Sequence, residues 1–147
     1  MYSHLSNAAT ICRGSMAKNT GPEIKVRKLL WINGFRYRLN RKDLAGSPDL
    51  VLPKYNSVIF IHGCFWHRHG CNATTLPKTR RTFWENKFNN NILRDKRNIQ
   101  KLITTSWRVL VIWECYLKNN KYNSDHIFDQ IKFFLHSDRK YLELDSL

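Results

Sequence analysis

The stretch HGCFWHRHGC, residues 62–71, places three histidines and two cysteines within ten positions. Histidine can carry protons at neutral pH, and both residue types bind zinc. The stretch also contains Phe65 and Trp66, large aromatic side chains in an otherwise polar segment. Three kinds of chemistry are therefore open to it: metal binding, proton transfer, and insertion of aromatic rings into a partner.

Three residues of this stretch, together with one much later in the chain, have the types expected of a structural zinc site, where the ion takes four tetrahedral nitrogen and sulfur ligands. The candidate ligands are Cys64, His69, Cys71 and Cys115. Spacing alone leaves His62 or His67 open as alternatives to His69. The cysteines could also be small buried hydrophobic residues. If zinc binds, we expect it to hold the loop to the apolar segment before Cys115. Its role would be structural and not catalytic, because a closed four-ligand site has no position for substrate.

A carboxylate, Asp49, stands at the start of a predicted strand, and Pro48 stiffens the backbone before it. On its own this pair is more typical of a turn. The next predicted strand, however, leads into His62 and then His67. A carboxylate that holds a divalent cation and a histidine that moves protons would together suit phosphodiester hydrolysis. Glu23 could reach the same place, although a first-turn acid also complements the helix dipole.

The remaining pattern predicts the elements that position these residues. The predicted helices run from Asn19 or Thr20 to about Gly34, from about Lys78 to Thr105 as one long helix or a helix pair, and onward from Ser124; the predicted strands are 35–39, 49–53, 57–61 and 107–114. In the first helix, Ile24, Leu29 and Leu30 are predicted to face inward. Residues 62–80 are too irregular for either class. The order α-β-β-β-loop-α-β-α indicates an α/β domain with a mixed sheet flanked by helices.

Charge is the most pronounced feature of the composition. The 147 residues include 25 Lys and Arg against 11 Asp and Glu, a net charge of +14. A basic surface concentrates polyanions, and the chain has no separate basic amphipathic helix for a membrane surface, so nucleic acid is the expected partner. No apolar run approaches the roughly 20 residues that span a bilayer. We expect a soluble, cytoplasmic protein with a DNA-contacting or flexible arm (1–18) and one domain (19–147).

Six segments of the chain carry a family resemblance. They are NTGPE, RKDLAGSPDLVLPKY, VIFIHGCFWHRHGC, LPKTRRTFW, RDKRNIQKL and WRVLVIWEC. Together, across residues 18–117, they resemble the very short patch repair (Vsr) DNA mismatch endonucleases. The resemblance implies a PD-(D/E)xK-like nuclease fold with a zinc-stapled loop, without the usual second catalytic pair. Phe60, Ile61 and His62, which stand where that pair would be, agree with this.

The resemblance also implies roles for individual residues. The implied catalytic residues are Asp49, His62, His67, Asp95 and Glu23. Magnesium would bind Asp49 and the backbone carbonyl of Ile61, and Asp95 would orient His67. The implied zinc ligands are Cys64, His69, Cys71 and Cys115. Phe65 and Trp66 would wedge into DNA beside the mismatch, where stacking is already weak.

The implied activity is magnesium-dependent nicking of one strand of duplex DNA beside a T:G mismatch. Because such mismatches arise when 5-methylcytosine deaminates, a cytosine-5 DNA methyltransferase is the expected companion, with general mismatch-repair proteins as further partners of a monomer. A nuclease that reads an unmispaired sequence and a non-catalytic zinc-stabilised DNA-binding module are the alternatives. In the arm, an ungapped alignment puts Cys12 where the family often has a methionine, and Met16 would need a shift, so neither is assigned.

Overall fold

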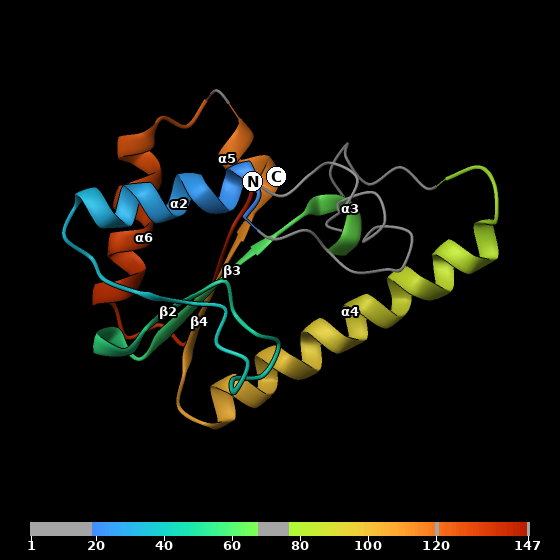
Figure 1. The fold of residues 1–147 in the computed structure, drawn as a ribbon, viewed down its shortest axis with the longest axis horizontal. Helices are drawn as coiled ribbons and strands as arrows, with labels where there is room; N and C mark the ends of the chain where they lie inside the picture. The colour runs from blue at the N-terminus through green and yellow to red at the C-terminus, as the bar shows by residue number, and fades with distance from the viewer. Residues whose placement is uncertain (1–18, 68–76, 120, 147) are drawn as a thin grey trace.

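A five-stranded mixed sheet forms the centre of the protein. The computed structural model describes residues 19–67, 77–119 and 121–146 (Figure 1). The elements are α2 (Gly21–Ile32), β1 (Arg38–Leu39), β2 (Leu50–Leu52), the 3-10 turn η1 (Pro53–Tyr55), β3 (Ser57–His62), α3 (Cys64–His67), α4 (Arg81–Thr104), β4 (Arg108–Trp113), α5 (Glu114–Lys118), α6 (Ser124–His136) and β5 (Tyr141–Leu144). The predicted arm, 1–18, and the candidate ligands His69 and Cys71 lie outside the described residues.

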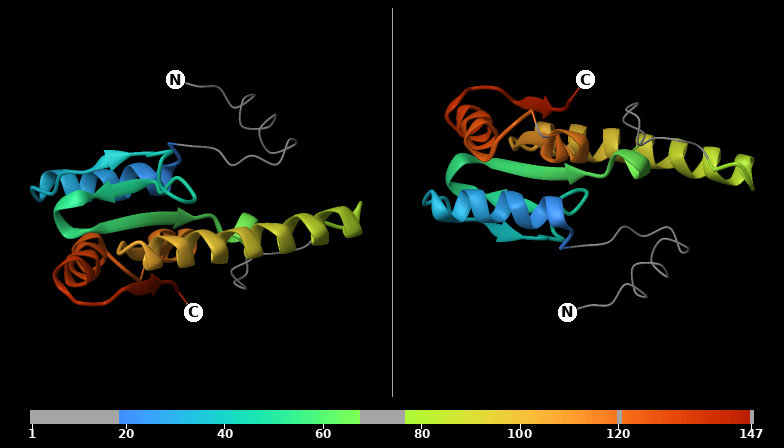
Figure 2. Two further views of the ribbon diagram at one scale, coloured as in Figure 1. Left: turned by 90° about the horizontal axis from the view of Figure 1, so that it is seen from below. Right: turned by 90° about the horizontal axis from the view of Figure 1, so that it is seen from above.

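The strands follow one another across the sheet in chain order. β1, β2 and β3 form an antiparallel meander, and β4 and β5 then add in parallel. Figure 2 shows β1 and β5, cyan and red, at opposite edges of the sheet, with β3 in green between them. Parallel neighbours need a crossover, and the long helix α4 supplies it between β3 and β4, as α6 does between β4 and β5. The predicted α/β class with a mixed sheet is confirmed.

Side chains alternate between the two faces of the sheet along each strand, so the core forms two layers. On one face, side chains such as Leu50, Ile59 and Leu110 pack with α2, α5 and α6. On the other face, side chains such as Val58 and Val109 pack with the C-terminal half of α4. Because β4 is buried on both faces, its almost continuously apolar sequence is explained. Figure 1 shows α2 and α6 on one side of the sheet and α4 on the other, running past the strand ends.

Two details of the predicted elements are wrong. Ile24 does not face inward: it is 38% exposed, while Val26, Leu29 and Leu30 form the buried stripe of α2. The predicted strand 35–39 is reduced to β1, because Phe35 packs into the core beside Leu30 and is not part of the strand.

Three short elements were not in the predicted order: α3 inside the supposed loop, α5 and β5. Among the described residues, no helix has the length and apolar character needed to cross a membrane.

Candidate active site

One cavity of about 460 Å³ lies between the sheet and α4, and the predicted catalytic residues converge on it. Asp49, His62, His67, Asp95, Glu23 and Ile61 all line this cavity. They come from the residue just before β2, the end of β3, α3, the middle of α4 and the first turn of α2. The fold therefore brings together residues that are up to 72 positions apart in the sequence, counted from Glu23 to Asp95.

The strand register explains why Asp49 and His62 share this face. Side chains alternate along β3, so His62 points to the same side as Val58 and Phe60, which is the α4 side. Leu50 pairs with Ile59 in the antiparallel ladder, which leaves Asp49 opposite Phe60. A one-residue slip in either strand would turn these groups to the opposite face.

A tight turn sets the backbone before Asp49. Gly46 has φ +76°, and a Cβ there would lie 3.1 Å from Asn98 Cβ and 3.2 Å from Phe60 Cε1. Glycine is therefore required by both the left-handed conformation and the close approach of α4. Past the buried Pro48, Asp49 Oδ2 accepts a hydrogen bond of 2.7 Å from the backbone N–H of Ile61. This bond fixes one carboxylate oxygen against the neighbouring strand.

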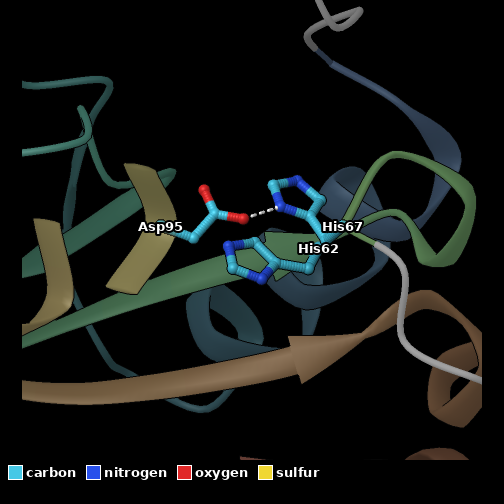
Figure 3. A group of neighbouring side chains, drawn as sticks. All are labelled: His62, His67 and Asp95. Atoms are coloured by element: carbon cyan, nitrogen blue, oxygen red, sulfur yellow. Dashed lines mark hydrogen bonds and ion pairs between the residues drawn. The ribbon is translucent and has the colours of Figure 1, made fainter. Parts of the chain in front are cut away.

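The two histidines form a stacked pair that Asp95 holds from α4. The ring centroids of His62 and His67 are 3.8 Å apart with an interplanar angle of 4° (Figure 3). His67 Nδ1 and Asp95 Oδ2 form a short hydrogen bond. Because a carboxylate accepts hydrogen bonds, this contact places a hydrogen on Nδ1 and, in the neutral ring, leaves the lone pair on Nε2. His67 is thus held in one tautomer and orientation.

Burial keeps His62 uncharged. The side chain is 6% exposed, and its pKa lies well below the ordinary value because desolvation disfavours the imidazolium, with the charges of His67 and Arg94 acting in the same direction. Its Nδ1 atom is buried and has no hydrogen-bond partner among the described residues. At neutral pH the pair therefore includes at least one neutral imidazole with a lone pair able to accept a proton.

The donor groups in the cavity suit a divalent cation bound mainly by oxygen. One ligand atom from each of His62, His67 and Asp95 lies within 4.8 Å of the others, a spacing that an ion could bridge. Imidazole lone pairs lie in the ring plane, however, and parallel stacked rings cannot both direct them at one ion. Magnesium prefers carboxylate and carbonyl oxygens. Asp49 supplies such an oxygen in the same cavity, so the residues present fit that ion.

Glu23 combines a helix-capping position with a place in the cavity wall. Thr20 caps α2, and its Oγ1 accepts from the Glu23 N–H. The Glu23 carboxylate accepts from the Asn19 N–H at 3.0 Å and pairs with Arg27 at 3.3 Å. These contacts resemble a capping box and account for the acid structurally. A role in catalysis stays a prediction.

Sequence reasoning missed four polar residues of the cavity: Asn40, Ser47, Arg94 and Asn98. Arg94 and Asn98 lie on α4 within one turn of Asp95, and the Arg94 guanidinium is 3.7 Å from the Asp95 carboxylate. Helical spacing around Asp95 was the available signal, because residues three and four apart share a face. Arg94 brings a positive charge to a cavity that otherwise contains three carboxylates.

Two of the four candidate zinc ligands lie in the described part of the chain. His62 pairs with Trp113 at the ends of β3 and β4, so Cys64 and Cys115 each follow two residues later. Both side chains belong to the same hydrophobic cluster on the α4 side of the sheet. Thiols carried together at the ends of two parallel strands fit a shared soft metal ion.

Phe65 packs within an aromatic group on the N-terminal half of α4. Its ring meets Phe88 edge-on at 5.1 Å and Trp84 at 6.1 Å, and it is partly buried. α4 therefore holds the Phe65 ring in place. The backbone of Trp66 belongs to α3, but its side chain lies outside the described structure.

Comparison with known proteins identifies relatives over most of the chain. A profile of the family described as DNA mismatch endonuclease Vsr matches residues 6–73. Type II nicking enzyme V.NmeAIP of Neisseria meningitidis is 50% identical over 103 residues, covering 70% of this chain and 74% of that protein. A DNA mismatch endonuclease Vsr of Escherichia coli is 40% identical over 113 residues, covering 77% and 72%. This chain belongs to the Vsr family and is a DNA endonuclease.

Proposed function

We propose that the protein nicks one strand of duplex DNA beside a T:G mismatch, with magnesium as its catalytic ion. The observation that carries this proposal is the convergence of Asp49, His62, His67 and Asp95 on one cavity. The similarity to a protein named as a mismatch endonuclease supports the choice of substrate. A cytosine-5 DNA methyltransferase, whose product deaminates to thymine, is the functional companion of such an enzyme, and general mismatch-repair proteins would act beside it.

The cavity residues would have separate roles in hydrolysis. Asp49 and the Ile61 carbonyl would hold magnesium, which supplies positive charge against the charge that develops on the phosphate. His67, held by Asp95, takes the proton of the attacking water at Nε2. His62 stacks on His67 and keeps that ring from tilting into the cavity, and Arg94 attracts the phosphodiester. Glu23 completes the acidic wall of the site.

Zinc is the second proposed ion, with Cys64, His69, Cys71 and Cys115 as ligands. The placement of Cys64 and Cys115 in one cluster supports this assignment. The ion would hold the segment after α3 against the end of β4. Trp66, with Phe65 behind it, would then be presented to the DNA as a wedge beside the mismatch.

A nicking assay on paired duplexes tests the proposal. Labelled duplexes that are identical except for a T:G pair or a matched pair are incubated with the protein and magnesium. We expect one nick, beside the mismatch. Asp49→Asn should abolish nicking while the Kd for the duplex changes little, because it removes the negative charge that holds magnesium and no phosphate contact. Asp43→Asn is the matched control: this aspartate belongs to the same loop but is exposed and paired with Arg41.

Each outcome of this assay has a definite meaning. Full activity of Asp49→Asn would contradict the active-site assignment. Equal nicking of the matched duplex at one sequence would instead favour a sequence-specific nicking enzyme. That alternative is supported by the similarity to proteins named type II nicking enzymes. Duplex binding without cleavage in any metal would leave only a DNA-binding module.

A further inference from the structure

Behind the histidine pair stands a wall formed by β4 and β5. Trp113 is the cross-strand neighbour of His62, and both side chains point to the α4 face. The indole meets His62 edge-on, with ring centroids 5.1 Å apart at 73°, and meets His67 at 6.1 Å and 74°. One buried ring therefore contacts both histidines at nearly the same angle.

Glu143 on β5 fixes the rotation of this indole. Trp113 Nε1 donates a 2.8 Å hydrogen bond to Glu143 Oε1, and Tyr141 Oη donates one of 2.6 Å to Oε2. Both carboxylate oxygens are thus engaged. An indole N–H is a donor only, and burying it without an acceptor is costly. The bond therefore selects the orientation of the ring that presents its edge to the histidines.

This contact matters because the histidines have open space on two sides. A second cavity of about 160 Å³ lies behind them and is lined by His62, His67, Asp95, Trp113 and Glu143. A ring between two cavities is free to tilt unless a neighbour limits it. Asp95 fixes one edge of His67, and the Trp113 edge is the contact shared by both rings.

We propose that Trp113 and Glu143 are positioning residues that hold the His62–His67 stack in its reactive orientation. The proposal rests on the role proposed above for the two histidines. Glu143 acts through Trp113 and touches no reacting atom. Because a misplacement of about 1 Å in a reacting group can cost about 100-fold in rate, loss of this support should slow the chemical step.

The test separates the chemical step from DNA binding. Single-turnover nicking rates at saturating enzyme, duplex Kd and melting temperature are measured for Glu143→Leu, Glu143→Gln and Trp113→Phe. We expect Glu143→Leu and Trp113→Phe to lower the rate constant roughly 10- to 100-fold with little change in Kd. Glu143→Gln keeps an acceptor oxygen for the indole and should recover most of the rate. The double variant Trp113→Phe/Glu143→Leu should be no slower than its slower single variant, since both remove one bond.

Two control variants distinguish the possible failures. Asp129→Leu on α6, across the sheet, should leave the rate unchanged. His67→Ala should be nearly inactive; if it is not, the proposed function fails and not this inference alone. With His67→Ala inactive, a wild-type rate in folded Glu143→Leu overturns the inference, as does equal loss in Glu143→Gln and Glu143→Leu. A change in Kd at constant rate also overturns it. If Glu143→Leu does not fold, the contrast between Trp113→Phe and Glu143→Gln decides in the same way.

Discussion

At the scale of single residues, the contacts of Phe65 distinguish the two aromatic residues of the predicted wedge. Phe65 is anchored to Phe88 and Trp84, so its ring cannot enter DNA without leaving those contacts. Trp66 is then the better candidate for the inserted ring. An anchored phenylalanine directly before it would stiffen α3, and a stiff wedge loses less conformational entropy on binding.

Truncation of Trp66 tests the wedge. Trp66→Ala removes a stacking partner worth roughly 1–3 kcal/mol, so it should lose much of the preference for T:G over matched duplex. Its salt-dependent binding to matched DNA should stay near wild type. Trp31→Ala is a suitable control, because Trp31 is a 52% exposed tryptophan at the end of α2. Unchanged discrimination in a folded Trp66→Ala, measured as the ratio of the two Kd values, would mean that the mismatch is read elsewhere.

The sequence predicts the members of the site better than their arrangement. Asp49, His62 and His67 stand out because a Pro-Asp pair opens one predicted strand and the next predicted strand leads into the two histidines. The stacking of the two histidines could not be predicted, since it depends on the direction in which α3 leaves β3. Trp113 and Glu143 look like ordinary strand residues until the pairing of β3, β4 and β5 places them behind the histidines.

At the scale of elements, long periodic segments were predictable and short ones were not. The bounds of α4 and β4 and the start of α6 were predicted closely, because the two helices show a sustained apolar period and β4 is almost continuously apolar. α3 has only four residues, fewer than are needed to show a helical period. β5 is a four-residue strand after a polar segment, and its pairing with β4 is a non-local contact.

The proposed zinc ion should stabilise the arrangement of elements by linking the end of β3 to the end of β4. We expect purified protein to contain about one zinc per chain. Cys115→Ser should lose the metal and lower the melting temperature, because the segment after α3 would lose its attachment. Cys12→Ser, outside the proposed ligand set, should keep both properties. Metal analysis of fresh, fully folded protein that finds no zinc would refute the assignment.

At the scale of the whole molecule, the net charge of +14 should dominate binding to DNA. Cations on the two sides of the sheet are not equivalent, however. Arg94 lines the cavity, whereas Lys132 is exposed on α6, which packs against the opposite face. If DNA lies across the cavity and α4, only the first of these charges is close to phosphate.

Salt dependence measures this difference. The logarithm of the DNA association constant should fall linearly with the logarithm of salt concentration, with a slope of roughly −0.9 per phosphate neutralised. Arg94→Gln should weaken binding to all duplexes and make the slope less steep by about one, because one phosphate contact is lost. Lys132→Gln, with the same change in net charge, should alter neither quantity beyond a small uniform effect. Equal changes in the two variants would mean that the charge acts only through the overall field and that DNA does not approach the α4 face. An affinity that hardly changes with salt would separate the basic surface from DNA binding altogether.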